Sequence, residues 1–380
     1  MSTKYTQKLE KLRERRSPPP TLAKSMEGYT FDSVDGGRSV TASAKPLKEA
    51  FEDKGKGDAA RYALGCMAEV APEYTATSIL DAKRIRSQLE GQSDSPVSTR
   101  LQGSVPLNIH IYASSDVDVL VFADWFRTVA EPIVDRSRYT MLPNLSPVAE
   151  LKKLRQFCEG LLEKKYPAAD VDVSGAKSIA ISGGSLARKV DVVPAHWVDT
   201  VDYQQTDIEA NRDVSILDKY RSETLTNRPF LHMSKIDDKD SASAGSAKSA
   251  IRLLKCLSRD SDNEIKLSSY DIASLIFHMS TSELLIGSYL PLQLLSRVEN
   301  YLRGLEANAQ YAKTLMTPDG TRSVLDSSEK VNSLSLLRQE LTDAIDNVAG
   351  EYNPELMRIF DRARAAEAAR RTLDETFIFG

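Results

Sequence analysis

The stretch DVDVLVF at residues 116–122 is dense in Val and Leu and is interrupted only by Asp116 and Asp118. β-Branched and aromatic residues favour strands. Residues 171–182 and 187–193 have a similar composition and also look like strands. Because all three are apolar on both faces apart from isolated acids, we predict central strands of a sheet that is covered on both sides.

Asp116 and Asp118 stand two residues apart, so their side chains point to the same face of the strand at a spacing of about 7 Å. Two carboxylates this close repel each other, and one tends to stay protonated unless a cation joins them. Magnesium takes oxygen ligands and commonly binds one or two carboxylates together with substrate phosphates. Asp191, in the third strand, would complete the set if that strand lay beside the first. The sequence therefore predicts a two-metal site for phosphoryl or nucleotidyl transfer.

Gly103-Ser104 lies upstream of the two acids. A glycine-serine turn leaves backbone N–H groups free to face an anion, and the hydroxyl adds a donor. We expect this turn to hold the β- and γ-phosphates of a nucleoside triphosphate. Each element alone has an ordinary structural explanation, and Asp191 could simply pair with Lys189 on the same strand face. Their order and their placement in strands favour the metal site.

Together, Gly103-Ser104, Asp116-Val117-Asp118 and Asp191 within VDVVPA resemble the polymerase-β-like nucleotidyltransferase superfamily. More narrowly, they are similar to the cyclic-GMP-AMP-synthase-like nucleotidyltransferases of bacterial antiviral systems. The resemblance implies an α/β (α+β) fold of two lobes, with a mixed central sheet, a long spine helix behind it and a C-terminal helical lobe. It also implies two Mg²⁺ ions, replaceable by Mn²⁺, with Asp116, Asp118 and Asp191 as catalytic metal ligands.

Two helical segments in the second half carry further candidate residues. Residues 248–259 place basic side chains, including Lys255, along one helix face, and a solvated face is the ordinary explanation. Residues 268–279 begin with a capping box, and a helix N-terminus also attracts anions. Both segments resemble the corresponding part of the animal cyclic GMP-AMP synthase. The resemblance assigns Lys255 and Ser269 to the triphosphate and Tyr270 to stacking on a base.

Two features limit the resemblance, and one histidine near the site is a further candidate. Many family members continue the Gly-Ser turn with a Gly-Thr pair, whereas this chain has Asn108-Ile109, which leaves donor geometry and base preference open. The animal DNA sensor carries a zinc-binding insert of His and Cys, and this sequence has no such cluster, so we predict no zinc and no DNA activator. His196 follows the third strand and could contact nucleotide, although such a residue is more often a packed ring.

Composition bounds the partners and the compartment. The chain has 380 residues and a formal net charge of −4, which gives no electrostatic argument for a duplex nucleic acid partner. Cys66, Cys158 and Cys256 are sparse and odd in number, which fits a reducing cytosol. The first 16 residues lack an apolar signal region, and no run of about 18 apolar residues occurs. We therefore expect a cytoplasmic protein without a membrane partner.

We expect four parts along the chain. From about residue 206 onward the strand signal fades, and helical periodicity takes over. The predicted parts are an N-terminal arm at 1–56, a nucleotidyltransferase core at 57–205, a helical lobe that closes the active-site cleft at 206–373 and an apolar C-terminal tail at 374–380.

Helical periodicity begins at about residue 58 and continues to about residue 89. Pro72, within this stretch, must kink or break the helix. A polar loop is expected at 237–246. The remaining helices are predicted at 246–259, 269–280, 282–306, 326–350 and 354–373.

The C-terminal tail ends in Phe-Ile-Phe-Gly, although chain ends are usually polar. One hypothesis is that the tail docks onto the helical lobe. The other follows from the resemblance, because some bacterial synthases of this kind are joined through their C-terminus by ubiquitin-activating-like and conjugating-like partners. On that hypothesis Gly380 is the site used by ubiquitin-like conjugation machinery.

The resemblance predicts an enzyme that condenses ATP and other NTPs into a cyclic di- or trinucleotide with release of pyrophosphate. The product would be a second messenger for a downstream effector, in antiphage signalling. A linear nucleotidyltransferase that makes oligoadenylate or extends RNA ends is an alternative, but it should need a basic track for RNA. A protein-modifying transferase and a non-catalytic nucleotide sensor are further alternatives, and the three acids argue against the sensor.

Overall fold

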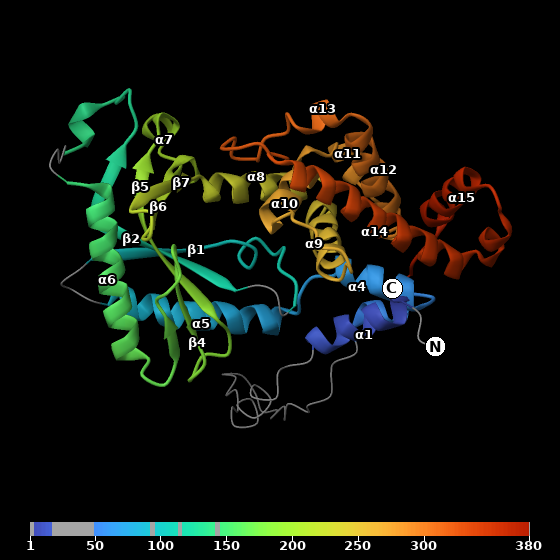
Figure 1. The fold of residues 1–380 in the computed structure, drawn as a ribbon, viewed down its shortest axis with the longest axis horizontal. Coiled ribbons are helices and arrows are strands. Elements are labelled where there is room, and N and C mark those ends of the chain that lie inside the picture. The colour runs from blue at the N-terminus through green and yellow to red at the C-terminus, as the bar shows by residue number, and fades with distance from the viewer. Residues whose placement is uncertain (1–3, 17–48, 92–95, 113–115, 141–144, 380) are drawn as a thin grey trace, which may run out of the picture.

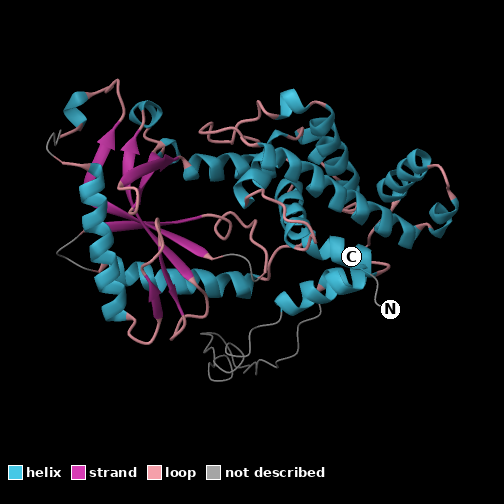
Figure 2. Cartoon of the chain, in the orientation of Figure 1, coloured by secondary structure: helices cyan, strands magenta, loops and turns pink. Residues whose placement is uncertain are grey.

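The computed structural model of the chain describes residues 4–16, 49–91, 96–112, 116–140 and 145–379. A sheet with helices against it forms one lobe, and a bundle of helices forms the other (Figures 1 and 2). The bilobed α/β architecture with a mixed sheet agrees with the predicted fold class. Most of the predicted N-terminal arm lies outside the described residues.

The described strands form one sheet in the order β1-β2-β5-β4-β3, which β6 and β7 extend from β5. The central pair, β2 and β5, is parallel, and the other pairs are antiparallel. The strands are β1 (Val97–Gln102), β2 (Val117–Val129), β3 (Asp170–Asp172), β4 (Ile179–Ser182), β5 (Val190–Asp199), β6 (Asp213–Asp218) and β7 (Glu223–Asn227).

Helices α5 and α6 pack against the sheet, whereas most other helices belong to the second lobe (Figure 1). No described helix is long and apolar enough to cross a membrane. The α-helices are α1 (Lys4–Arg16), α3 (Ala50–Lys54), α4 (Asp58–Met67), α5 (Pro72–Glu90), α6 (Pro147–Lys165), α7 (Val201–Thr206), α8 (Pro229–Ala242), α9 (Ser246–Arg259), α10 (Ser269–His278), α11 (Thr281–Leu284), α12 (Gln293–Ala307), α13 (Ala309–Ala312), α14 (Ser328–Tyr352) and α15 (Arg362–Glu375).

Strand β2 is buried on both faces, as predicted. Val119 and Val121 face the core under α5 and α6, because alternate residues of a strand point to one side. Leu120 and Phe122 face the opposite core, where Phe122 stacks on Trp197 of β5 with ring centroids 3.9 Å apart. By the same alternation, Asp118 belongs to the face of Leu120 and Phe122.

Pro72 separates two helices, as the sequence predicts. It is the first residue of α5, where the missing N–H costs nothing because the first turn has no acceptor for it. The core of the helical lobe takes in Leu9 of α1 and Tyr62 of α4 as well as the later helices. The predicted domain boundaries remain a prediction, although α1 and α4 share this core across the boundary at 56/57.

Five secondary-structure predictions were wrong. The strands do not end near residue 206, because β6 and β7 extend the sheet and Val214 is buried against β5. The polar segment 237–246 is largely helical, since α8 runs to Ala242 and buries Ile236 on one face. The single helix predicted at 282–306 is divided into α11 and α12, with Pro291 between them.

The segment 171–182 is not one central strand but contains the antiparallel strands β3 and β4, and β3 lies at the sheet edge with Asp170 and Asp172 exposed. The single helix predicted at 354–373 is divided into the 3-10 helix η3 (Pro354–Arg358) and α15.

Candidate active site

The three predicted acids meet at one end of the central strand pair. In the parallel register of β2 and β5, Asp118 lies opposite Asp191. Asp116 directly precedes β2, and the Lys189 ammonium links the outer two acids. Its Nζ lies 2.8 Å from Asp116 Oδ2 and 3.2 Å from Asp191 Oδ2. The sheet therefore brings the acids together, and the ion pair expected between Lys189 and Asp191 is present.

Among the described residues no cation forms an ion pair with Asp118, although Lys189 acts on it from a greater distance. Burial raises the pKa of Asp118 to about 7, and the neighbouring Asp191 and Asp116 add to the shift. Burial also raises the pKa of Asp191, while Lys189 opposes that rise. No hydrogen bond joins Asp118 to another described side chain. This end of the strand pair is therefore short of positive charge.

The acids suit a magnesium ion in chemistry, although they do not yet enclose one. Among the described residues, no group of three His, Cys, Asp or Glu side chains has the spacing of a preformed metal site. The Lys189 ammonium instead lies between Asp116 and Asp191, in the position that a metal ion would take. Carboxylate oxygens are the ligands that Mg²⁺ prefers, and the unpaired Asp118 lies beside both. The residues fit the metal once Lys189 moves aside.

The Gly-Ser turn lies directly against these acids. Strand β1 ends at Gln102, which pairs with Asp118, so Gly103 follows beside that carboxylate. Gly103 has a φ of +88°, and a Cβ at this position would lie 2.7 Å from Asp118 Oδ2. Only glycine satisfies both the backbone and the space. The turn closes where the Ile109 N–H donates to the Ser104 carbonyl at 3.0 Å.

Lys255 lies behind the turn rather than in solvent. Its side chain is buried, and Nζ donates to the Ile109 carbonyl at 2.7 Å. Arg252, one turn earlier, donates to the Asn108 carbonyl at 2.7 Å. A solvated face is therefore wrong for these two residues. Burial lowers the pKa of Lys255 to about 8, an effect that the nearby Arg252 charge reinforces.

The start of α10 presents Ser269 and Tyr270. The predicted capping box is present, because the Asp271 N–H donates to Ser268 Oγ and the Ser268 N–H donates to Asp271 Oδ2. Ser269 is exposed at the first position of the helix. The Tyr270 ring stacks on His232 with centroids 3.7 Å apart, and its hydroxyl donates to Asp319 at 2.8 Å. The ring is thus held in place by two other segments of the helical lobe.

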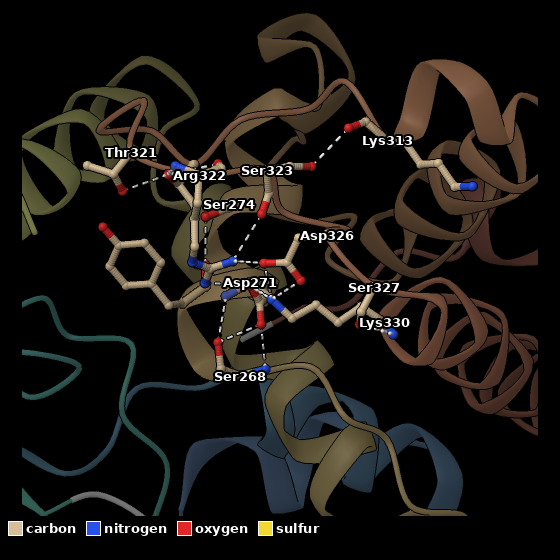
Figure 3. A network of polar contacts seen from close by, with 12 residues as sticks. Ser268, Asp271, Ser274, Lys313, Thr321, Arg322, Ser323, Asp326, Ser327 and Lys330 are labelled. Carbon is tan, nitrogen blue, oxygen red and sulfur yellow. Dashed lines mark hydrogen bonds and ion pairs between the residues drawn. The ribbon is translucent and has the colours of Figure 1, made fainter. Parts of the chain in front are cut away.

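Figure 3 shows how Asp271 joins α10 to the segment before α14. Its carboxylate is almost fully buried and lies 2.7 Å from Arg322 Nη2 and 3.2 Å from Lys330 Nζ. Both cations also pair with Asp326. The carboxylate that caps α10 therefore also fixes the hairpin at 316–323, which is closed by the bridge between Met316 and Ser323 and carries Asp319.

Sequence reasoning missed the partners of Tyr270. Thr317-Pro318-Asp319-Gly320 reads as a turn, with Pro at its second position and Gly at its fourth, but nothing in the sequence aims it at Tyr270. His232 stood in no recognisable motif. His196, in contrast, is a packed ring, buried edge-on against Phe126.

The parallel strand pair, its opposed acids and the adjoining Gly-Ser turn define a nucleotidyltransferase. No model of a known protein family matches the chain. The chain is 36% identical over 364 residues to the cyclic dinucleotide synthase CdnE of Yersinia aleksiciae, and the match covers 93% of each protein. It therefore belongs to the CdnE family of cyclic dinucleotide synthases.

Solved structures agree in fold. The STING-associated CdnE c-di-GMP synthase from Capnocytophaga granulosa has a TM-score of 0.69 and 26% identity, covering 91% of this chain and 99% of the other. The corresponding c-di-GMP synthase from Flavobacteriaceae sp. has a TM-score of 0.72 and 22% identity, with 92% and 99% covered. The predicted family, fold class and enzyme class are confirmed by these comparisons.

Proposed function

We propose that the three acids of this protein catalyse two successive nucleotidyl transfers that close a cyclic dinucleotide. The pairing of Asp118 with Asp191 across two parallel strands, directly beside Gly103, carries the proposal. In each transfer a bond forms between a ribose oxygen and the α-phosphorus of an NTP. The bond from that phosphorus to the pyrophosphate oxygen breaks, and the hydroxyl proton passes to Asp191 or to water.

Asp116 and Asp118 would hold both of two magnesium ions, and Asp191 would complete the site nearer the attacking hydroxyl. When bound, such ions lower the pKa of the hydroxyl and neutralise charge on the phosphates, and Mn²⁺ would serve in place of Mg²⁺. The protein's own part is to orient these carboxylates, and the sheet register does so for Asp118 and Asp191. Residues on rigid strands hold catalytic geometry better than residues on loops.

Gly103 and Ser104 would contact the triphosphate, together with Ser269. Lys255 contacts the carbonyl of Ile109 behind the turn, and its ammonium would exchange this carbonyl for a phosphate oxygen when the triphosphate binds. Tyr270 would stack on a base. The names of the relatives favour GTP and a ring of two nucleotides. ATP-derived and three-nucleotide products are the alternatives that the product assay separates.

The test is an incubation of the purified protein with each NTP alone and with all four, in MgCl₂, followed by phosphatase treatment and mass spectrometry. The proposal expects a phosphatase-resistant product with the mass of cyclic di-GMP. A product that phosphatase shortens would establish the linear nucleotidyltransferase instead. Binding of NTPs without any pyrophosphate release would leave a nucleotide sensor.

Replacing Tyr270 with Leu is expected to raise the KM for NTP about tenfold, because base stacking on an aromatic ring contributes on the order of 1–3 kcal/mol. Tyr270→Phe keeps the ring and loses only the hydrogen bond to Asp319, so its KM should stay within about threefold of the parent. Pyrophosphate release measured against NTP concentration gives both values. Equal KM values for Tyr270→Leu and the parent would remove the stacking role.

We also propose that the product signals to a downstream effector in antiviral defence. The name of the Capnocytophaga granulosa relative, a STING-associated synthase, supports a cyclic-dinucleotide receptor as that effector. The cytoplasm is the proposed site of action, because the three cysteines are free and buried and NTPs are abundant there.

The C-terminal tail combines features of both hypotheses. Ile378 is buried in the helical-lobe core, and its N–H donates to the Tyr289 carbonyl at 2.8 Å. Phe377 and Phe379 on either side are 57% and 72% exposed. Gly380 lies outside the described residues.

Deletion of residues 377–380 is expected to abolish attachment to a protein through the C-terminus while leaving nucleotide synthesis within about twofold, since the deletion does not reach the acids. Incubation with ubiquitin-activating-like and conjugating-like partner proteins, followed by mass spectrometry, gives the first readout. Phe377→Ser, which keeps the chain length, is the control. Unchanged conjugation after the deletion would exclude the tail as the attachment site.

A further inference from the structure

Lys189 occupies the space between the two outer acids of the site. Its ammonium contacts Asp116 at 2.8 Å and Asp191 at 3.2 Å, although 41% of its side chain remains exposed. The proposed chemistry assigns this residue no role. A cation shared by two metal ligands lies where a shared metal ion would have to bind.

The backbone fixes Lys189 in this place. It immediately precedes β5, two residues before Asp191 and on the same strand face. Its carbonyl accepts from the Val117 N–H at 3.5 Å, at the start of β2. The preceding loop is tied to α5, because the Arg188 N–H donates to Asp81 at 2.9 Å. The backbone at Lys189 is therefore fixed, and only the side chain can rotate away from Asp116 and Asp191.

An ammonium and a divalent ion exclude each other between the same carboxylates. Free metal must first break two ion pairs, of which the one between Lys189 and Asp116 is exposed and therefore weak. A metal ion that arrives with a triphosphate supplies new anionic oxygens for the displaced ammonium. The exchange is therefore more favourable with nucleotide than with metal alone.

We propose that Lys189 is a tethered cation that holds the metal position of the free enzyme and makes metal binding depend on nucleotide. This inference rests on the metal ligands assigned under the proposed function. By linkage, the factor by which nucleotide increases the affinity for metal equals the factor by which metal increases the affinity for nucleotide. Lys189 should raise this common factor.

The experiment titrates the metal-free protein with MnCl₂ by calorimetry and compares four proteins. Lys189→Met should bind Mn²⁺ about five- to tenfold more tightly than the parent, since the competing cation is gone. Lys189→Arg keeps the charge and should bind about as the parent does. Lys165→Met, at the exposed end of α6, makes the same change in net charge away from the site and should also match the parent.

A second measurement follows the affinity for a non-hydrolysable GTP analogue with and without MnCl₂. The factor by which Mn²⁺ improves this affinity should be smaller in Lys189→Met than in the parent. Mn²⁺ affinity in Lys189→Met no higher than in Lys165→Met would overturn the inference. If the parent bound no Mn²⁺ even with the analogue, the metal ligands themselves would be wrong. Thermal unfolding in EDTA confirms that each variant is folded.

Discussion

An Asp118→Asn variant is expected to lose at least about a thousandfold in the rate of nucleotidyl transfer. Asp118 is the central acid of the three, and burial together with the charges of Asp191 and Asp116 raises its pKa. Asparagine has the same shape but no negative charge, so it is a poor ligand for magnesium. The lost stabilisation of charge in the transition state corresponds to roughly 4 kcal/mol. Pyrophosphate release at saturating NTP measures the loss.

The fold should survive this change, because the substitution removes a carboxylate that its neighbours repel. Thermal unfolding without metal should occur at the parent's temperature or above it. Asp124→Asn makes the same change farther along β2, where the side chain is exposed and contacts Ser98, and should keep parental activity. More than about a tenth of the parental rate in Asp118→Asn would contradict the assignment of Asp118 as a metal ligand.

A Gly103→Ala variant is expected to lose about a hundredfold in transfer rate and about 1–3 kcal/mol in the free energy of unfolding. The backbone conformation accounts for the stability loss, since an L residue at a φ of +88° is strained. The new methyl group would meet the Asp118 carboxylate at 2.7 Å, so that carboxylate or the turn must shift. A displacement of about 1 Å at reacting groups is enough to lower a rate a hundredfold.

Gly245→Ala separates the two effects. Gly245 has nearly the same φ, +87°, but no atom lies within 4 Å of an added Cβ. This control should lose stability as Gly103→Ala does and keep its transfer rate. Denaturant unfolding and pyrophosphate release give both quantities for each variant. Equal activity losses in the two variants would mean that strain alone, and not contact with Asp118, explains the effect.

The local part of the acid cluster was predictable because it follows from short-range rules. Alternation along a strand places Asp116 with Asp118 and Lys189 with Asp191, whereas the pairing of β2 with β5 that brings Asp191 to Asp118 was only a condition of the prediction. Pro72 likewise marks a helix start whatever surrounds it. These features depend on residues close in sequence, so the sequence alone could predict them.

The rest depends on contacts that no local pattern encodes. Tyr270 and Asp319 are 49 residues apart, and their hydrogen bond exists only because the hairpin packs on α10. For Lys255 the ordinary alternative to the predicted phosphate contact was a solvated position, because charged residues are usually exposed, yet the side chain is buried and donates to a backbone carbonyl. Helix α8 was missed because only a few of its residues, such as Ile236, are buried, which leaves a weak helical period.

The position of α1 sets an order for folding during synthesis. Lys8 donates to Glu340 at 2.8 Å, a contact that spans 332 residues. At ribosomal rates of about 5–20 residues per second, the helix waits roughly 17–66 s for this partner. The sheet, whose last strand ends at Asn227, can assemble while translation continues. The helical lobe can pack around α1 only after α14 has emerged. We therefore expect ribosome-bound chains in which the sheet is folded and the helical lobe is still incomplete.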